Sequence, residues 1–323
     1  MGAPRIGFVG CGEHTTNNLC PVLSAAGLDL AAVCDLDKRK AQRVCRLFGA
    51  HRSYQDLATM VEEMDLDAVA VCGPPELHAE TALEALGHGL HVWTESPPAP
   101  TIAEARRVAE AAAARGLIVQ VGFMMRFAPA YARLAEIISS EDFGEPTMLA
   151  ARYCTGKAGG HRQHLLLDVL HMIDLTRRLM GEVSALCAFK CERAGQVTSA
   201  VTLRFESGAV GVLQLSSLQP QVQERVEVSG AGATAIVEGR ANLRWQTPAQ
   251  SDPGQWNTWG PDLAMQNVAN STARLRGYLP ALAHFARAVA GEVEPAATVE
   301  DAIAAMELAE AIERGEGEVV EIG

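Results

Sequence analysis

The sequence predicts a two-domain α/β protein, with a doubly wound parallel sheet in the N-terminal domain and a large open, mostly antiparallel sheet in a C-terminal α+β domain. Three observations lead to this fold class. The chain has 323 residues, which suits two domains at the usual allowance of about 150 residues each. Short β-like runs alternate with helical stretches up to residue 123, and alternating strands joined by tight turns follow later. We therefore expect one domain over residues 1–123 and a second over residues 124–323.

Composition restricts the classes of function. Hydrophobic residues make up 48% of the chain and charged residues 20%, a balance that favours a packed core over disorder. The formal net charge of −12 repels nucleic-acid phosphates and anionic membrane surfaces. No apolar run reaches the roughly 18 residues of a membrane-spanning helix. These features predict a cytoplasmic protein with no nucleic-acid or membrane partner.

Eight cysteines are spread through the chain without the density of a disulfide scaffold, so we expect them to be reduced. Cys187 and Cys191 form a C-x3-C pair, but no second pair follows it. Ordinary packing is favoured over a zinc site there, and no metal is expected.

Strands alternate with helices in the N-terminal part. The clearest helix covers residues 101–115, where Thr101 and Glu104 form a capping box and Gly116 supplies a stop signal. Pro21 interrupts the first helix and is expected to kink or restart it. The expected strands cover residues 5–9, 30–34, 68–72, 91–95 and 117–121.

The pattern changes in the second half. Two hairpins are expected, one joining residues 200–205 to 209–215 and one joining 225–228 to 234–237, because alternating residues flank glycine turns. An extended run covers residues 147–154, and a last short strand covers 319–322. The expected helices cover residues 131–138, 164–180, 278–290 and 299–314.

A glycine turn follows the first strand directly and opens a helix. Gly10 permits a tight turn, and Gly12 lets backbone N–H groups approach a pyrophosphate at the helix N-terminus. The third position of the G-x-G-x-x-G pattern is Thr15, so the motif is incomplete. Glu13 and His14, which lie in this turn, are counted among the expected cofactor-binding residues.

Asp35 ends the second strand, at the position where an acid accepts hydrogen bonds from ribose hydroxyls. Its carboxylate would repel a 2′-phosphate, which favours NAD over NADP. Three basic residues at 38–40 weaken this preference, although they also suit a solvated first helical turn. Strand, glycine turn, helix, strand and acid in this order predict a Rossmann dinucleotide site.

Three longer segments then resemble the glucose-fructose oxidoreductase, inositol dehydrogenase and rhizopine-catabolism (Gfo/Idh/MocA) family. They are AVAVCGPPELH at 68–78, GLHVWTESP at 89–97 and VGFMMRFAP at 121–129. The resemblance continues through HMID at 171–174, FESGAV at 205–210 and the helix-strand unit at 302–320, so it covers essentially the whole chain.

This resemblance implies nicotinamide-dependent chemistry on a sugar, a cyclitol or a related small molecule, and a C-terminal sheet used in oligomer formation. It also implies that Pro74, His78, Glu95 and Arg126 line the cofactor and substrate cleft. The residues agree in part, because Pro74 and Glu95 end strands at the carboxyl edge, where ligands bind in open α/β sheets. His78 has an alternative interpretation as a packing or capping residue.

The chain departs from the family at the end of the fourth strand. The family pattern is Glu-Lys-Pro, whose lysine binds the substrate hydroxyl or carbonyl, whereas this chain has Glu95-Ser96-Pro97. Serine can donate one hydrogen bond but brings no positive charge to an oxygen that becomes anionic. Lys157 and Lys190 are the remaining candidates for a substitute, because Lys38 and Lys40 lie by the adenosine end.

A second departure concerns His171. Family members often carry an acid four residues before this histidine, but that position is Leu167, and Asp168 lies three residues before it. Asp168 is expected to orient His171 as an acid/base pair. The alternatives for Asp168 are solvent or pairing with Arg162 or Arg178.

Two further groups could bind ligands. His161, His164, Asp168 and His171 form a helical stripe, but one ion could bind only a subset of them, so a metal is the minority hypothesis. Trp256 and Trp259 could stack on a sugar ring or fill an apolar lid.

The leading hypothesis is an NAD-dependent oxidoreductase, forming a homodimer or homotetramer, with His171, Asp168 and Ser96 as catalytic residues. Two alternatives stay open. One is an NAD-binding regulatory or partner protein without turnover. The other is a non-redox enzyme that holds NAD tightly and oxidises its substrate transiently.

Overall fold

The structure is a computed structural model that describes residues 2–156, 159–248, 255–260 and 268–322. It consists of two compact units, which are described separately. The first contains Met1–Met124 and Asn267–Ala304, and the second contains Met125–Gln266 and Ala305–Gly323. Within the described ranges, no helix is both long enough and apolar enough to cross a bilayer.

The first unit is built on a six-stranded parallel sheet of order β3-β2-β1-β4-β5-β6. The order reverses between β1 and β4, which is the switch point where open α/β sheets bind ligands. The strands are β1 (Arg5–Val9), β2 (Asp29–Cys34), β3 (Arg52–Tyr54), β4 (Ala68–Val71), β5 (His91–Thr94) and β6 (Val119–Val121). Five of these strands were expected, whereas β3 was missed because it is short and begins with Arg52 and Ser53.

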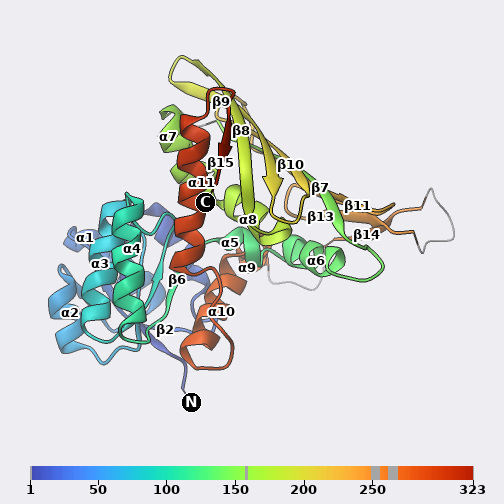
Figure 1. The fold of residues 1–323 in the computed structure, drawn as a ribbon. Helices are drawn as coiled ribbons and strands as arrows, with labels where there is room; N and C mark the ends of the chain where they lie inside the picture. Colours follow the sequence, from blue (N-terminus) through green and yellow to red (C-terminus); the bar gives the residue numbers. More distant parts are fainter. Residues whose placement is uncertain (1, 157–158, 249–254, 261–267, 323) are drawn as a thin grey trace. The chain divides into compact units, whose positions relative to one another are not determined.

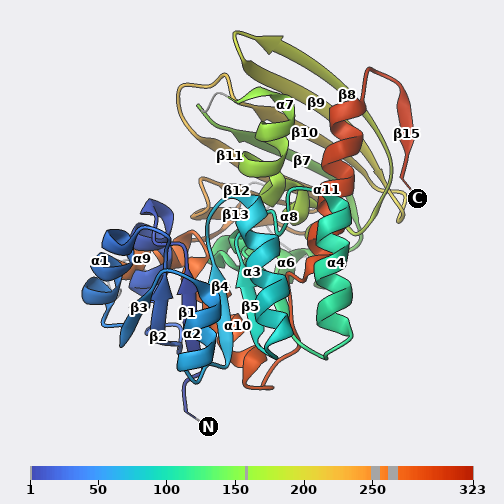
Figure 2. The ribbon, with the colours of Figure 1, turned by 90° about the vertical axis from the view of Figure 1, so that its left-hand side faces the viewer.

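Helices lie on both faces of this sheet, with α3 and α4 in front and α10 behind in Figure 2. Thr101 caps α4 as expected, since its hydroxyl accepts the Glu104 N–H at 3.2 Å and donates to the Glu104 carboxylate at 2.7 Å. The helices are α1 (Lys38–Phe48), α2 (Leu57–Glu63), α3 (Pro75–Gly87), α4 (Ile102–Ala113), α9 (Val268–Leu275) and α10 (Tyr278–Val289).

The helix expected before Pro21 has an irregular form. A π-helical turn covers Thr15–Leu19, and a 3₁₀ turn covers Cys20–Val22. Pro21 provides no N–H, so it cannot extend the ladder of helical hydrogen bonds. The chain therefore forms one wide π turn and one tight 3₁₀ turn in place of a kinked α-helix. Single π turns often occur at functional sites.

Residues 267–304 return to the first unit, whereas the sequence assigned them to the C-terminal domain. The buried Gln120 amide donates to the Ala281 carbonyl of α10 at 2.9 Å. The Val121 N–H donates to the Ala297 carbonyl at 2.7 Å. These bonds complete the edge of the sheet at β6, and no local sequence pattern reports them because they join distant segments.

The second unit is built on a nine-stranded sheet of order β14-β13-β12-β11-β7-β10-β9-β8-β15 (Figure 1). Among the described strands of this sheet, only β7 and β10 pair in parallel, so the sheet is mostly antiparallel, as expected. The strands are β7 (Pro146–Cys154), β8 (Val183–Arg193), β9 (Gln196–Phe205), β10 (Val210–Ser216), β11 (Gln223–Gly230), β12 (Thr234–Glu238), β13 (Asn242–Gln246), β14 (Asn257–Trp259) and β15 (Val319–Glu321). Both expected hairpins are present, as β9–β10 and β11–β12.

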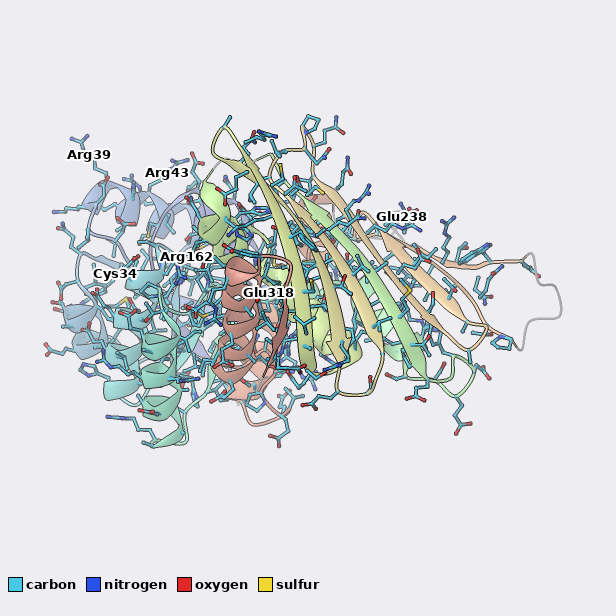
Figure 3. All side chains as sticks on the ribbon, turned by 45° about the horizontal axis from the view of Figure 1, so that its top comes forward. Cys34, Arg39, Arg43, Arg162, Glu238 and Glu318 are labelled. Carbon is cyan, nitrogen blue, oxygen red and sulfur yellow. The ribbon has the colours of Figure 1, made fainter. Side chains whose placement is uncertain are left out.

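One face of this sheet is buried under helices, which lie in front of it in Figure 2. Along β9, residues from Val197 to Phe205 alternate between buried and exposed positions, as expected for a strand covered on one side. The other face carries charged side chains such as Glu238, which projects from β12 in Figure 3. The helices are α5 (Met124–Phe127), α6 (Pro129–Ile138), α7 (Gly160–Gln163), α8 (Leu170–Met180) and α11 (Val299–Arg314), whose part up to Ala304 belongs to the first unit.

The helix expected over residues 164–180 is broken. A π-helical turn covers His164–Asp168, the backbone of Val169 takes φ −111° and ψ 0°, and α8 begins at Leu170. The Val169 N–H donates to the His164 carbonyl at 3.1 Å, which inserts an extra residue into the turn. The expected stripe of His161, His164, Asp168 and His171 on one regular helix is therefore wrong, because the wide turn rotates the later residues.

A buried ion pair ties α6 to the sheet of the second unit. The Tyr131 hydroxyl donates to the Glu224 carboxylate at 2.7 Å, and the Arg240 guanidinium binds the same carboxylate. Burial and the charge of Glu224 raise the pKa of Tyr131 well above its usual value, so it remains a donor. Arg240 also donates to the Tyr153 hydroxyl at 3.1 Å. Each member of the group satisfies another away from water.

We expect Glu224→Ala to lower the free energy of unfolding by about 3–5 kcal/mol, because it leaves the Arg240 charge buried and unpaired. Glu227→Ala is the matched control on the same strand. Glu227 is about one-third exposed and pairs with Arg225, so its loss should cost about 1 kcal/mol or less. Urea unfolding measures both free energies. Equal losses would show that the buried pair contributes no more to stability than the exposed pair.

Candidate active site

The turn after β1 has the geometry of a dinucleotide-binding turn. Gly10 has φ +91°, and a Cβ built on it would lie 2.0 Å from the Cys72 carbonyl oxygen, so only glycine fits. Gly12 is exposed, and a Cβ built there would meet nothing within 4 Å. The first glycine thus permits the close approach of β1 to the end of β4, and the second leaves open space above the turn for a ligand.

Thr15 compensates for the missing third glycine. Its side chain is buried, and its hydroxyl donates to the Gly10 carbonyl at 2.7 Å. Thr15 therefore closes the turn through a side-chain hydrogen bond, although it departs from the G-x-G-x-x-G pattern. The path of the backbone remains compatible with a pyrophosphate at this edge.

Asp35 lies at the end of β2 beside this turn. One carboxylate oxygen accepts the Cys11 N–H at 2.7 Å, and the other accepts the Asp37 N–H at 2.8 Å. Each carboxylate oxygen can accept two hydrogen bonds, so both retain capacity for ribose hydroxyls. Asp35 and the glycine turn therefore fit an adenosine ribose and a pyrophosphate.

The basic residues near Asp35 are exposed on α1. Asp37 caps this helix by accepting the Arg39 N–H at 2.8 Å, and Lys38, Arg39 and Lys40 are all exposed. Figure 3 shows Arg39 and Arg43 projecting outward from α1. Their arrangement agrees with the solvated first turn that the sequence analysis left open.

His78 lies buried between the ends of two strands, while Pro74 is exposed at the start of α3. The His78 Nε2 accepts the Gly73 N–H at 3.0 Å, and Nδ1 donates to the Pro97 carbonyl at 2.7 Å. Burial lowers the pKa of His78, which keeps the ring neutral as these two bonds require. His78 therefore acts on the sheet edge by joining the segment after β4 to the segment after β5.

Glu95 is the buried acid of this edge. One oxygen lies 3.1 Å from His14 Nε2, and the other accepts the Ser96 N–H at 3.2 Å. A Cβ on Gly122 would lie 2.9 Å from the Glu95 carboxylate, so this glycine makes room for it. Burial and the charge of Glu95 raise the pKa of the neighbouring Cys72 thiol to about 12, so this thiol stays protonated.

The expected catalytic residues of the second unit lie around the helix break at Val169. Asp168 Oδ2 lies 3.3 Å from His164 Nδ1, a pairing that the sequence analysis did not anticipate. Arg162, one of the partners considered for Asp168, binds Glu313 at 3.0 Å. His171 is half-buried in the first turn of α8.

Buried polar atoms also occur in the residues that precede this break. The His161 Nε2 forms a hydrogen bond with the Ser199 hydroxyl at 2.9 Å on β9. Within the described ranges, the other ring nitrogen of His161, Nε2 of His164 and the hydroxyl of Thr155 are buried without a hydrogen-bond partner. Buried polar atoms of this kind usually bind a water molecule or a ligand group.

Arg126 is held inside the second unit. Its guanidinium makes two hydrogen bonds of 2.6 Å to the fully buried Asp174 on α8. A bidentate pair of this kind fixes the orientation of the guanidinium plane. The HMID segment and the segment around Arg126, both part of the family resemblance, therefore meet in one ion pair.

The other candidate residues from the sequence are two lysines and Trp256. Lys157 lies outside the described residues, and Lys190 donates to the Glu313 carbonyl at 2.9 Å on the exposed end of β8. The Arg244 guanidinium lies 5.0 Å from the centre of the Trp256 ring, so that ring already has a cationic partner. In the part of the chain that the structure describes, no three His, Cys, Asp or Glu side chains gather to hold a metal ion.

Neither unit contains the whole set of expected site residues. The first unit brings together Gly10, Gly12, Glu13, His14, Asp35, Pro74, His78, Glu95 and Ser96 along one sheet edge, and the second contains Arg126, Asp168 and His171. Sequence reasoning missed the contact of His14 with Glu95 and that of His164 with Asp168. The latter had a signal, because its spacing of four residues suits neighbours on a helix.

Two family models match successive parts of the chain. Residues 4–123 match the family model described as an oxidoreductase family with an NAD-binding Rossmann fold. Residues 136–317 match the model of the C-terminal alpha/beta domain of the same family.

The chain is 28% identical over 255 residues to scyllo-inositol 2-dehydrogenase (NAD(+)) of Bacillus subtilis (strain 168), covering 73% of this chain and 72% of that relative. It is 33% identical over 183 residues to inositol 2-dehydrogenase 4 of Saccharopolyspora erythraea, covering 55% of this chain and 54% of that protein. The fold is similar to the crystal structure of a dehydrogenase from Chromobacterium violaceum, with a TM-score of 0.91 and 23% identity over 98% of this chain and 96% of that one.

The two family models together cover most of the chain, and both units have the corresponding sheets. The first unit is an NAD-binding Rossmann domain, and the protein is an oxidoreductase of the Gfo/Idh/MocA family.

Proposed function

We propose that the protein is an NAD-dependent dehydrogenase that oxidises a hydroxyl group of a sugar, a cyclitol or a related polyol, with Ser96 at the position of the family lysine. The observation that carries the proposal is the edge of the parallel sheet. Asp35 lies at the end of β2, and Glu95 and Ser96 follow β5, on the other side of the switch point. This separation suits an extended dinucleotide with its ribose at Asp35 and its reactive end by Ser96.

NAD, when bound, supplies the acceptor for the hydride that leaves the substrate carbon. The residues of the chain manage the hydroxyl proton and the position of the substrate. His171 is proposed to take the proton, because an imidazole can accept and return one near neutral pH. Ser96 is proposed to orient the substrate oxygen with one hydrogen bond.

The substrate class is proposed from two kinds of support. Relatives of this chain are named inositol dehydrogenases. The second unit also holds buried polar atoms of Thr155, His161 and His164 that have capacity for hydroxyl groups. A polyol carries several hydroxyls and could satisfy such atoms, whereas an apolar substrate would leave them unpaired.

Two other functions remain as alternatives to this proposal. A partner protein without turnover would bind NADH but oxidise no member of a broad polyol panel. A non-redox enzyme that uses NAD transiently would retain the cofactor through purification. Ser96 motivates both, since it lacks the charge of the family lysine.

Self-association through the open face of the nine-stranded sheet is part of the proposal. Met148 and Val210 are neighbours in the β7–β10 register, and Phe189 lies on the same face. All three are exposed, with Phe189 at 63%. Large exposed apolar side chains on a broad sheet favour an interface with a second copy.

We expect a mass of at least a dimer in solution at micromolar concentration. Phe189→Glu together with Val210→Glu should shift the population toward monomer, because like charges would be buried against the partner. Sedimentation velocity measures both. Val222→Glu is the control, since Val222 is also exposed but precedes β11. A strictly monomeric unmodified protein would exclude the proposed assembly.

We expect Asp35→Ala to weaken NADH binding far more than NADPH binding, because the lost hydrogen bonds serve ribose hydroxyls while the lost charge repels a 2′-phosphate. Isothermal calorimetry with each cofactor measures the two affinities. Asp37→Ala is a neighbouring control that removes the helix cap. An unchanged NADH affinity in Asp35→Ala would remove this residue from the site.

We expect His171→Ala to lower turnover by about 10² to 10⁴-fold through loss of general acid/base catalysis. Ser96→Ala should be milder, because only one hydrogen bond is lost. The assay follows NADH formation with scyllo-inositol, myo-inositol and a polyol panel, with NADH affinity measured in parallel. Wild-type turnover by His171→Ala would show that this residue is not the proton acceptor.

A further inference from the structure

The imidazole of His14 and the backbone of Ser96 share one carboxylate. His14 Nε2 lies 3.1 Å from one oxygen of Glu95, and the Ser96 N–H donates to the other oxygen at 3.2 Å. The Glu95 side chain is 11% exposed, while that of His14 is 42% exposed. A largely buried acid therefore anchors an imidazole that remains accessible from outside.

Other contacts hold the ring of His14 in place. The ring of Tyr278 meets it edge to face, with centroids 5.5 Å apart and an interplanar angle of 71°. The Asn18 amide lies 3.3 Å from His14 Nδ1. The same amide nitrogen donates to the His14 carbonyl at 3.4 Å, so both of its contacts with His14 are long. The long Asn18 contact is also one that a ligand oxygen could replace.

The topology places this pair on the nicotinamide side of the sheet edge. His14 lies in the turn after β1, and Glu95 follows β5, so the side chain of His14 reaches across the end of β4. Asp35 marks the adenosine side at the end of β2. His14 is thus displaced from the glycine turn toward the edge where Ser96 replaces the family lysine.

The site needs a group with positive charge at this edge. An alcohol oxygen gains negative charge as its proton leaves and its carbon gives up a hydride, and a cationic donor stabilises that charge. Ser96 cannot supply it. Among the four lysines of the chain, Lys190 is bound to the Glu313 carbonyl on β8, Lys38 and Lys40 begin α1, and Lys157 lies outside the described residues.

We propose that the imidazolium of His14, anchored by Glu95, makes the contact with the substrate oxygen that the lysine makes in the family. This inference rests on the proposed dehydrogenase function and adds a second residue to it. The Nδ1–H of His14 donates a hydrogen bond to the substrate oxygen while the hydroxyl proton leaves. His14 forms and breaks no covalent bond, so the overall reaction remains alcohol plus NAD⁺ to carbonyl compound, NADH and a proton.

The carboxylate of Glu95 has a defined part in this arrangement. A carboxylate that binds one imidazole nitrogen orients the ring and stabilises its protonated form, as in acid–histidine pairs of hydrolases. The same carboxylate accepts the Ser96 N–H, so the ring of His14 and the backbone of Ser96 are both bound to Glu95. Glu95 is a positioning residue in this scheme.

The first experiment uses three variants of the full chain with scyllo-inositol, myo-inositol and the polyol panel. His14→Ala and His14→Gln should each lower kcat by about 10² to 10³-fold, the usual cost of losing one charge-stabilising donor. His51→Ala is the control, because this histidine is exposed in the loop before β3 and should leave kcat unchanged. Recovery of activity in His14→Gln would overturn the proposal, since glutamine can replace a hydrogen-bond tether but not a charge.

The decisive variant restores the family residue. Ser96→Lys in the His14→Ala background places an ammonium next to the Glu95 carboxylate in the chain. We expect the double variant to regain at least tenfold in kcat over His14→Ala. A double variant that is no better than His14→Ala, although it binds NADH normally, would overturn the proposal.

Calorimetry with NADH distinguishes a His14 that contacts the substrate from a His14 that holds the cofactor. His14→Ala should bind NADH within threefold of the wild-type affinity. A loss of tenfold or more would mean that the pair of His14 and Glu95 holds the cofactor, and the proposal would fail on that result alone.

A crystal structure of the NADH complex tests the proposal without turnover. His14 Nδ1 should lie beside nicotinamide C4 with Nε2 still on Glu95, whereas a ring against the pyrophosphate or turned to solvent would overturn the assignment. If the wild-type protein oxidises nothing on the panel, the dehydrogenase function fails, and this structure still decides the placement of His14. If it turns over and His14→Ala does so equally, only the His14 proposal fails.

Discussion

The approach of the β1 turn to the end of β4 determines the arrangement of the dinucleotide edge. The Cys72 carbonyl leaves no room for a Cβ on residue 10, so the chain must turn there with a positive φ. Thr15 then closes the turn onto the Gly10 carbonyl in place of a third glycine. The same turn sends His14 toward β5 and leaves Gly12 exposed. The path of the glycine turn and the position of His14 beside Glu95 therefore follow from one close approach of the backbone.

Most of the fold could be predicted because its strongest signals are local. The hairpins β9–β10 and β11–β12 follow from two-residue alternation around glycine turns, and α4 follows from its capping box. The misses have physical reasons. β3 is too short to show a period, and the breaks at Val169 and Pro21 arise from hydrogen bonds that apolar spacing does not report. The return of residues 267–304 to the first unit depends on bonds such as Gln120 to Ala281, which join distant segments.

The candidate site was predictable where a residue's role follows from its position on a strand. Asp35 and Glu95 follow strands of a parallel sheet, and the carboxyl ends of such strands lie at one edge regardless of the conformation of the loops. The partners of the side chains were not predictable in this way. His14 meets Glu95 across 81 residues, and Asp168 lies 3.3 Å from His164 within a π turn. Patterns in one sequence indicate which face of a helix or strand a residue occupies. A contact between side chains of distant strands becomes visible only in the folded structure.

The exchange of lysine for serine need not remove the charge from this edge. A lysine at residue 96 would bring its own charge on a flexible stem, with Glu95 next to it in the chain. With serine there, His14 Nε2 lies 3.1 Å from the Glu95 carboxylate, so a group capable of positive charge reaches the same edge from the glycine turn. Imidazole is planar and gains or loses its proton near neutral pH, whereas lysine remains charged unless it is buried. A site built on His14 would therefore use a planar imidazole, held by Glu95, where the family pattern has a flexible lysine.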